Sequence, residues 1–345
     1  MKNIMKPFSR RLKKLGYFRR KGIIKSVAIA KKHIFSMIKG YPNSIMVEAS
    51  SKCNLTCSMC WAYRASEYRK NTFLNIQDFK KIINDLSPFC SKLFFSFCGE
   101  PLMNNDIYDM IKYSEKRNMI VGLSTNATLL TKSNAIKLLE SHLDELVVSL
   151  DAASKKTYDS MRVGGDFDKV ISGVEFLINE KKRRRLSSPK VILQMILTQK
   201  NEAEVNEFIR LARELRADAV TIKSLFIDHH GDNDYQKILA DEYLVANHIV
   251  SRYDKWQGDQ VKLKKMGTCP NNKSPIINSD GDVCVCCFDI FGEYKQGNTL
   301  KEHFLDIWNR SDYQKFRDDT MLNRKLPICQ FCVYSDVPEI NIPLA

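Results

Sequence analysis

Six apolar segments alternate with amphipathic segments between residues 44 and 226, and this alternation restricts the fold more than any other feature of the chain. The apolar segments, rich in Val, Ile, Leu and Phe, read SIMVEAS, KLFFSFCGE, MIVGLSTN, ELVVSLD, KVILQMIL and AVTIKSLF. Helical stretches lie between them, at 76–86, 104–117, 132–141, 166–182 and 201–215. Such alternation indicates parallel βαβ units. We therefore predict an α/β protein built on a partial (β/α)6 TIM-type barrel, whose chemistry sits at the C-terminal ends of the strands.

The 345 residues are enough for a barrel and further parts. We expect a basic N-terminal arm over 1–42, the barrel over 43–226, a polar linker over 227–268 and a small C-terminal module over 269–345. The linker has one helical stretch, near 236–253. In the module, SPIINSDGDVCVCC predicts a β-hairpin with Asp-Gly at its turn. LKEHFLDIWNRSDYQKFRDD predicts a helix after it.

The positive charge of the sequence lies in its N-terminal arm. The chain contains 54 Lys and Arg against 40 Asp and Glu, and residues 1–40 hold 13 Lys or Arg and no acidic residue. Taking 13 from 54 leaves 41 basic against 40 acidic residues, so the rest of the chain is almost neutral. A charge block of this kind predicts a contact made by the arm rather than by the body. We expect no specific nucleic-acid partner.

The arm also has the pattern of an amphipathic helix. Ile24, Val27, Ala28, Phe35 and Ile38 fall roughly on one face. Two placements are open: a helix packed on the outside of the barrel, or a helix docked on an anionic membrane surface or an acidic carrier. No apolar run approaches the roughly 20 residues that span a bilayer, and the N-terminus lacks the features of a signal peptide. We expect a cytoplasmic protein, with peripheral contact at the inner membrane surface as one alternative.

Eleven cysteines make a metal-binding protein a better interpretation than a disulfide scaffold. Three of them, Cys53, Cys57 and Cys60, lie in CNLTCSMC directly after the first predicted strand. Three thiolates on one loop can hold three irons of a [4Fe–4S] cluster and leave the fourth iron open to an outside ligand. A structural zinc site or a redox site is the alternative.

CNLTCSMC resembles the CxxxCxxC signature of radical S-adenosylmethionine (SAM) enzymes. The resemblance, which extends through residues 44–226, implies that Cys53, Cys57 and Cys60 hold a [4Fe–4S] cluster. It implies that the amino and carboxylate groups of SAM chelate the open iron. Reductive cleavage of SAM then gives methionine and a 5′-deoxyadenosyl radical, which abstracts a hydrogen atom from the substrate.

The segment CGEP, residues 98–101, resembles the GGEP motif of the same family. The resemblance implies that Gly99, Glu100 and Pro101 meet the SAM amino group, with Cys98 in place of the first glycine. The alternative for Glu100 is a solvated loop acid. Met59 stands where the family often has an aromatic residue, and we expect its apolar side chain to pack there.

Two further strand ends resemble SAM-binding motifs. In STN, Ser124 and Asn126 are implied near the ribose and carboxylate of SAM. Ser149 and Arg162 resemble a pair that holds the SAM carboxylate, for which a guanidinium is suited. The structural alternatives are a helix cap for Ser124 and a surface ion pair for Arg162.

The C-terminal module resembles a shortened SPASM domain, often called twitch. The resemblance implies four ligands of one closed auxiliary [4Fe–4S] cluster: Cys269, Cys286, Cys329 and Cys332. The Gly-x4-Cys spacing from Gly281 favours Cys286, and Cys284 is its geometric rival because alternate residues of a strand share a face. Cys284 and Cys287 are otherwise packed thiols or a hydrogen donor to a substrate radical. A zinc ion on the same four cysteines is the alternative.

The resemblance implies a radical SAM oxidoreductase, and we expect two-electron oxidation of a small-molecule or carrier-bound substrate. The alternatives are maturation of a ribosomal peptide by crosslinking or epimerisation, sugar or nucleoside epimerisation, and decarboxylation. A non-enzymatic iron–sulfur redox sensor is a more distant one. We expect an electron donor such as flavodoxin or ferredoxin, and no residue can be named as the proton acceptor or hydrogen donor.

Overall fold

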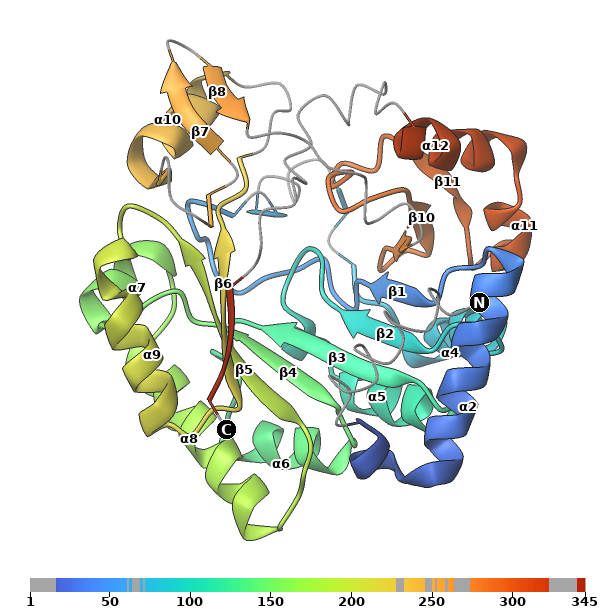
Figure 1. Cartoon of the computed structure of the whole chain (residues 1–345), viewed down its shortest axis with the longest axis horizontal. Coiled ribbons are helices and arrows are strands. Elements are labelled where there is room, and N and C mark those ends of the chain that lie inside the picture. The colour runs from blue at the N-terminus through green and yellow to red at the C-terminus, as the bar shows by residue number, and fades with distance from the viewer. Residues whose placement is uncertain are drawn as a thin grey trace, which may run out of the picture.

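The computed structural model describes residues 17–60, 62–63, 69–70, 72–227, 233–245, 250–251, 253–257, 260–263, 274–322 and 340–344. All six predicted strands form, and they lie side by side in parallel (Figure 1). Their bounds are β1 (Ser44–Val47), β2 (Lys92–Phe95), β3 (Ile120–Thr125), β4 (Glu145–Ser149), β5 (Lys190–Leu197) and β6 (Ala219–Ser224). The α/β fold with a partial TIM-type barrel is therefore confirmed, and its sheet remains open because β6 does not pair with β1.

Helices cover the outer face of this sheet. They are α4 (Ile76–Leu86), α5 (Ile107–Lys116), α6 (Lys132–Glu140), α7 (Lys155–Met161), α8 (Phe167–Arg183) and α9 (Val205–Glu214). Helix α4 shows the pattern that fixes them: Asn75 caps its N-terminus by accepting from Gln77 N and Asp78 N, and Phe79, Ile82, Ile83 and Leu86 are buried. Only α7 had no counterpart among the predicted helices.

C-terminal segments cover both edges of the barrel sheet. Strand β9 (Ile276–Ile277) adds in parallel to β1, and it continues through β10 (Asp282–Cys284) into β11 (Lys295–Asn298). At the other edge, β12 (Ile340–Pro343) pairs antiparallel with β6. Covered edges are protected from pairing with other chains. The predicted hairpin is confirmed, whereas β12 was not predicted.

The remaining elements adjust the sequence-based expectations. The single helix expected after the hairpin is two short helices, α11 (Phe304–Trp308) and α12 (Ser311–Leu322). The linker helix is α10 (Asn233–Tyr243), earlier than expected, and a two-stranded sheet of β7 (Tyr253–Gln257) and β8 (Gln260–Leu263) follows it. The domain limits proposed from the sequence stay a prediction.

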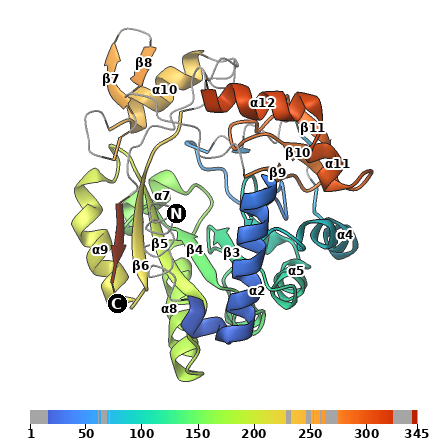
Figure 2. The same ribbon diagram turned by 45° about the vertical axis from the view of Figure 1, so that its right-hand side comes forward.

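The N-terminal arm forms α2 (Tyr17–Lys39), whose backbone is broken at Gly22 by a φ of 76°. It lies against α5 on the outside of the barrel (Figures 1 and 2). Lys25 forms an ion pair with Glu115, and Lys32 Nζ donates to the carbonyl of Arg117. Among the described residues, no helix is both long and apolar enough to cross a membrane.

Candidate active site

A cavity of about 230 Å³ opens at the C-terminal ends of the strands. Its lining comes from the loop after β1 and from the ends of β2 to β5. It includes ten of the sequence-predicted site residues: Cys53, Cys57, Cys60, Gly99, Glu100, Pro101, Ser124, Asn126, Ser149 and Arg162. Segments that are distant in the sequence thus meet at one point, as parallel strands require.

The cysteine loop is held by its own apolar side chains and by backbone contacts. Leu55 and Met59 are buried, with 3% and 6% exposure, so Met59 packs as expected. Thr56 N donates to Val163 O at 3.0 Å, and Asn54 Nδ2 donates to Thr128 Oγ1 at 2.8 Å. These contacts fix the loop against the segments that follow β3 and α7.

The three cysteines line the cavity in different environments. Cys53 is exposed, Cys57 is buried and Cys60 is half-buried. Leu55 N and Asn126 Nδ2 donate to Cys53 Sγ at 3.4 and 3.7 Å, and such bonds tune cluster ligands. Burial raises the pKa of the Cys57 thiol to about 11, against the opposing charge of Arg162. Among the described residues, no three His, Cys, Asp or Glu side chains gather closely enough for a single metal ion; a cluster with one thiolate per iron does not need that.

Gly99 allows the loops after β1 and β2 to lie in contact. Its φ is +72°, and a Cβ there would stand 2.2 Å from Ser50 O and 2.6 Å from Lys52 O. The next residue, Glu100, donates its backbone N–H to the same Lys52 O at 2.7 Å. Cys98 is 3% exposed and packs with Ile290, outside the cavity lining. Cysteine at the family's first glycine is therefore accommodated away from the cavity.

The carboxylate of Glu100 joins the end of β2 to the end of β3. It accepts from Leu102 N at 3.0 Å, from Thr125 Oγ1 at 2.7 Å and from Asn126 N at 2.7 Å. Glu100 is 1% exposed, and burial raises its pKa against these three donors. The alternative of a solvated loop acid is therefore wrong.

Ser124, Ser149 and Gln194 form a chain of polar side chains across β3, β4 and β5. The hydroxyls of Ser124 and Ser149 are 3.4 Å apart, and Gln194 Nε2 donates to Ser149 Oγ at 3.4 Å. Helix α6 is capped by Thr131, so a capping role for Ser124 is wrong. Gln194 lines the cavity and was not predicted. The signal was present, because it is the one polar residue inside the apolar run VILQMIL.

Arg162 forms an ion pair, but not on the surface. Its guanidinium lies 2.5 Å from Asp151 Oδ2, and the two side chains are 12% and 0% exposed. Asp151 also accepts from Ile196 N at 2.7 Å. Arg162 Nε is buried without a hydrogen-bond partner in the described part of the chain. A buried, unpaired guanidinium N–H at a cavity wall fits an anionic ligand such as a carboxylate.

The described residues cover part of the predicted auxiliary site. Cys269, Cys329 and Cys332 lie outside them. Cys284 is 0% exposed, accepts from Asn278 Nδ2 at 3.2 Å, and has a pKa raised by burial. Cys286 is half-buried, and Phe288 N donates to its sulfur at 3.3 Å. Both sulfurs therefore accept an N–H···S contact of the kind that cluster ligands make, and the two cysteines differ in burial: Cys284 is fully buried and Cys286 is half-buried.

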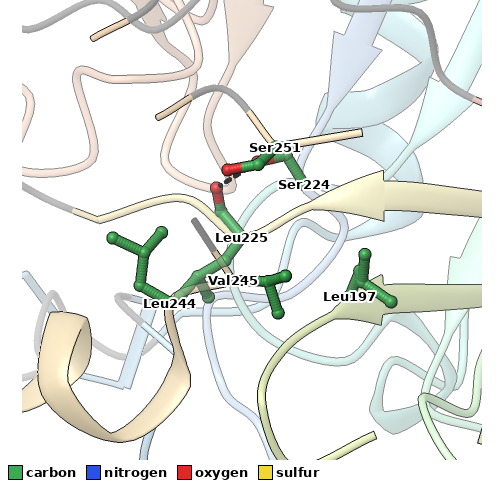
Figure 3. Close-up of a pocket in the computed structure, with 6 residues that line it drawn as sticks. All are labelled: Leu197, Ser224, Leu225, Leu244, Val245 and Ser251. Atoms are coloured by element: carbon green, nitrogen blue, oxygen red, sulfur yellow. Dashed lines mark hydrogen bonds between the residues drawn. The ribbon is translucent and has the colours of Figure 1, made fainter. Parts of the chain in front are cut away.

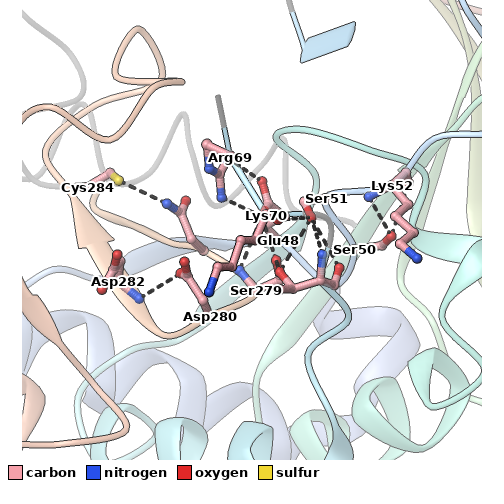
Figure 4. Close-up of polar contacts among 12 residues, drawn as sticks. Glu48, Ser50, Ser51, Lys52, Arg69, Lys70, Ser279, Asp280, Asp282 and Cys284 are labelled. Atoms are coloured by element: carbon pink, nitrogen blue, oxygen red, sulfur yellow. Dashed lines mark hydrogen bonds and ion pairs between the residues drawn. The ribbon is translucent and has the colours of Figure 1, made fainter. Parts of the chain in front are cut away.

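The buried carboxylate of Glu48 connects the hairpin to the barrel, because it pairs with Arg69 and also binds Ser279 of the hairpin (Figure 4). Arg69 donates to both oxygens of Glu48, at 2.8 and 3.0 Å, just beyond the end of β1. Ser279, between β9 and β10, donates its hydroxyl to Glu48 Oε1 at 2.8 Å. Because Glu48 lies five residues before Cys53, this contact positions the hairpin beside the cysteine loop.

A second pocket lies where β5 and β6 end, beside the segment that follows α10 (Figure 3). Most of its lining is apolar: Leu197, Ser224, Leu225, Leu244, Val245 and Ser251. It has no room for a water molecule, so it is a packing defect rather than a binding site.

Curated relatives match most of this chain. A tungsten-containing aldehyde ferredoxin oxidoreductase cofactor-modifying protein from Pyrococcus furiosus is 26% identical, over 85% of this chain and 87% of its own length. An AdoMet-dependent heme synthase from Methanosarcina barkeri is also 26% identical, over 84% and 89%. Mycofactocin maturase MftC from Mycolicibacterium smegmatis is 25% identical, over 79% and 71%.

Solved structures share the fold. Streptococcus suis SuiB bound to S-adenosylmethionine superposes with a TM-score of 0.62 at 16% identity, over 88% of this chain and 76% of that one. The enzyme anSMEcpe with bound AdoMet gives 0.59 at 18% identity, over 81% and 80%. Residues 269–333 match the SPASM iron-sulfur cluster-binding domain, and residues 47–237, more than half of the chain, match the Radical SAM superfamily. The chain therefore belongs to the radical SAM superfamily, as an enzyme that uses SAM and a [4Fe–4S] cluster and carries a C-terminal SPASM iron–sulfur domain.

Proposed function

We propose that this enzyme removes a hydrogen atom from a small-molecule or carrier-bound substrate and releases a product two electrons more oxidised. When bound, SAM with its cluster supplies the hydrogen-abstracting radical, and the auxiliary cluster accepts an electron. The observation that carries the proposal is the attachment of the SPASM hairpin to β1 through β9 and through Glu48 and Ser279. Just after Cys286, the ring of Phe288 contacts that of Phe226 beyond the end of β6, and Ile290 packs with Cys98 beyond the end of β2, which supports a position of the auxiliary cluster near the C-terminal ends of the strands.

The proposed cluster ligands are Cys53, Cys57 and Cys60, which line one cavity. The proposed SAM contacts are the other predicted residues of its lining: Gly99, Glu100, Pro101, Ser124, Asn126, Ser149 and Arg162. Among them, Arg162 Nε offers an unpaired donor to a carboxylate. Glu100 is occupied by three protein donors, so its part is to shape the wall through its backbone.

For the auxiliary cluster, we propose Cys269, Cys286, Cys329 and Cys332 as ligands, with Cys284 a packed thiol. A small carrier of single electrons such as flavodoxin or ferredoxin is the proposed reductant. The names of the relatives from P. furiosus and M. barkeri refer to cofactors, and this chain spans most of both proteins. This supports a small-molecule substrate. Peptide maturation is the second candidate, favoured by the similarity to mycofactocin maturase.

The test is product mass after anaerobic turnover with SAM, dithionite and a fractionated metabolite extract. Substrates are recognised as the fractions that accelerate 5′-deoxyadenosine release. A product two mass units below its substrate, with one SAM consumed per turnover, is expected. Unchanged mass in ordinary water with one deuterium gained in heavy water means epimerisation and refutes the proposal. Acceleration only by peptide fractions supports the second candidate instead.

A further inference from the structure

Helix α2 turns its apolar side chains toward solvent. Among the described residues, twelve large apolar side chains are exposed, and seven of them lie on this one helix: Ile23, Ile24, Val27, Ile34, Phe35, Met37 and Ile38. Ile24 and Ile38 are exposed by 86% and 74%. At 100° per residue, the seven positions occupy one arc of about 160°. Single exposed hydrophobic residues are common, but a gathered patch marks an interaction surface.

The other side of α2 carries small and polar residues together with one half-buried isoleucine, Ile29, and it makes the contacts with the barrel. Ser26 and Ser36 are 4% and 1% exposed. Lys25 pairs with Glu115, and Lys32 donates to the carbonyls of Arg117 and Asn118 at the C-terminal end of α5. This arrangement is the reverse of an ordinary surface helix, whose apolar stripe faces the core. The amphipathic pattern in the sequence therefore does not serve to pack the arm on the barrel.

The charge around this face is of one sign. Residues 1–40 hold 13 Lys or Arg and no acidic residue. Lys31 and Lys39 are both exposed: at 100° per residue Lys31 lies within the apolar arc and Lys39 borders it, and long lysine side chains can extend past an apolar surface to reach a charged one. Two copies of the chain meeting through α2 would bring two such arms together, and their like charges would repel. A lipid bilayer with anionic headgroups would complement both features of the arm: its headgroups would attract the positive charges, and its apolar interior would take up the exposed apolar arc.

We propose that α2 docks this enzyme on an anionic lipid bilayer, with the exposed apolar arc in the headgroup and acyl boundary and the basic residues on anionic headgroups. Beyond the break at Gly22, the helix runs over 17 residues, Ile23–Lys39, or about 25 Å. In Figure 2 it lies at the front of the molecule. The residues that it contacts, Arg117 and Asn118, directly precede β3 and so lie at the N-terminal ends of the strands, whereas the cavity lies at their C-terminal ends. Docking thus leaves the mouth open to substrate.

The experiment is flotation of the full-length enzyme with vesicles of equal parts phosphatidylcholine and phosphatidylglycerol, and with vesicles of phosphatidylcholine alone. We expect binding to the anionic vesicles only, weakening as salt rises. Replacing Ile24, Ile34 and Ile38 together by Ser should reduce binding by about tenfold or more, because partition follows the apolar area buried. Replacing Lys31 and Lys39 by Gln should reduce it by roughly fivefold per lysine.

The matched control is Ile238→Ser, which alters a side chain of 51% exposure on α10 and should not change binding. The Ser variants should keep the wild-type thermal unfolding midpoint and SAM cleavage, since the replaced side chains lie in solvent. No anionic-vesicle binding by the wild-type enzyme at low salt overturns the proposal. A concentration-dependent dimer that only the triple Ser variant loses also overturns it, and assigns the face to a second copy.

Discussion

Removing the charge of Glu48 should loosen the SPASM hairpin from the barrel. Glu48 and Arg69 are 0% and 10% exposed, and the carboxylate receives two bonds from Arg69 and one each from the Ser279 hydroxyl and backbone N–H. Glu48→Gln keeps the volume of the side chain but leaves a buried guanidinium without its counter-charge. Breaking a buried pair on one side lowers the free energy of unfolding by about 3–5 kcal/mol. For a unit of this size that corresponds to a fall of roughly 6–20 °C in the unfolding midpoint.

The assay is thermal unfolding of reconstituted protein under anaerobic conditions, followed by circular dichroism and by loss of the iron–sulfur absorbance. The control is Glu140→Gln, which breaks the exposed pair with Arg184 and should change stability by no more than about 1 kcal/mol. Arg69→Met in addition to Glu48→Gln should recover part of the loss, because it removes the uncompensated charge. Equal effects of the Glu48 and Glu140 substitutions would refute the reasoning.

Three further substitutions test the site. Cys286→Ala should reduce the iron content from about eight to about four per chain, whereas Cys284→Ala should keep about eight; the reverse result would make Cys284 the ligand. Gly99→Ala should destabilise the protein more than the control Gly40→Ala. Gly40 has a similar positive φ but open space around it, so its substitution should lower the free energy of unfolding by only about 1–2 kcal/mol. Equal unfolding midpoints of the two variants would contradict the close contact of Gly99 with Ser50 and Lys52. Arg162→Lys keeps the charge beside Asp151 but removes the Nε donor, and should weaken SAM binding about tenfold or more, as measured by equilibrium dialysis; an unchanged dissociation constant would remove Arg162 from the SAM contacts.

The parts of the fold that the sequence predicted are those that rest on local periodicity. The βαβ alternation placed all six parallel strands, and the rule for strand ends brought ten predicted residues to one cavity. Asp-Gly at 280–281 predicted the hairpin turn, where Gly281 has a φ of +87°. In each case the signal is contained within a few neighbouring residues.

What the sequence did not predict depends on pairs that are far apart in the chain. Strand β12 pairs with the edge strand β6, a partner more than 100 residues away in the sequence, so the local pattern of residues 340–343 does not predict it. The tie between Glu48 and Ser279 joins residues 231 positions apart. Asp151 takes part in the site through its ion pair with Arg162, which the intervening helix α7 brings back toward the end of β4. Such contacts follow from the assembled sheet, not from a local pattern.

Helix α2 shows a further limit of periodicity. The amphipathic pattern of residues 23–38 correctly predicts a helix, and the usual inference is that its apolar face packs on the core. Here the side toward the barrel carries Ser26, Ser36 and two lysines that bind the end of α5, with the half-buried Ile29 as its one large apolar residue among those described. A hydrophobic stripe indicates that one face of a helix is to be buried, but it does not indicate whether that face is buried against the protein core or in a lipid bilayer. The contacts of α2 with the other described residues lie mainly on its opposite side, so the apolar arc is left for a partner, and the one-sided positive charge of the arm supports the proposed anionic lipid surface.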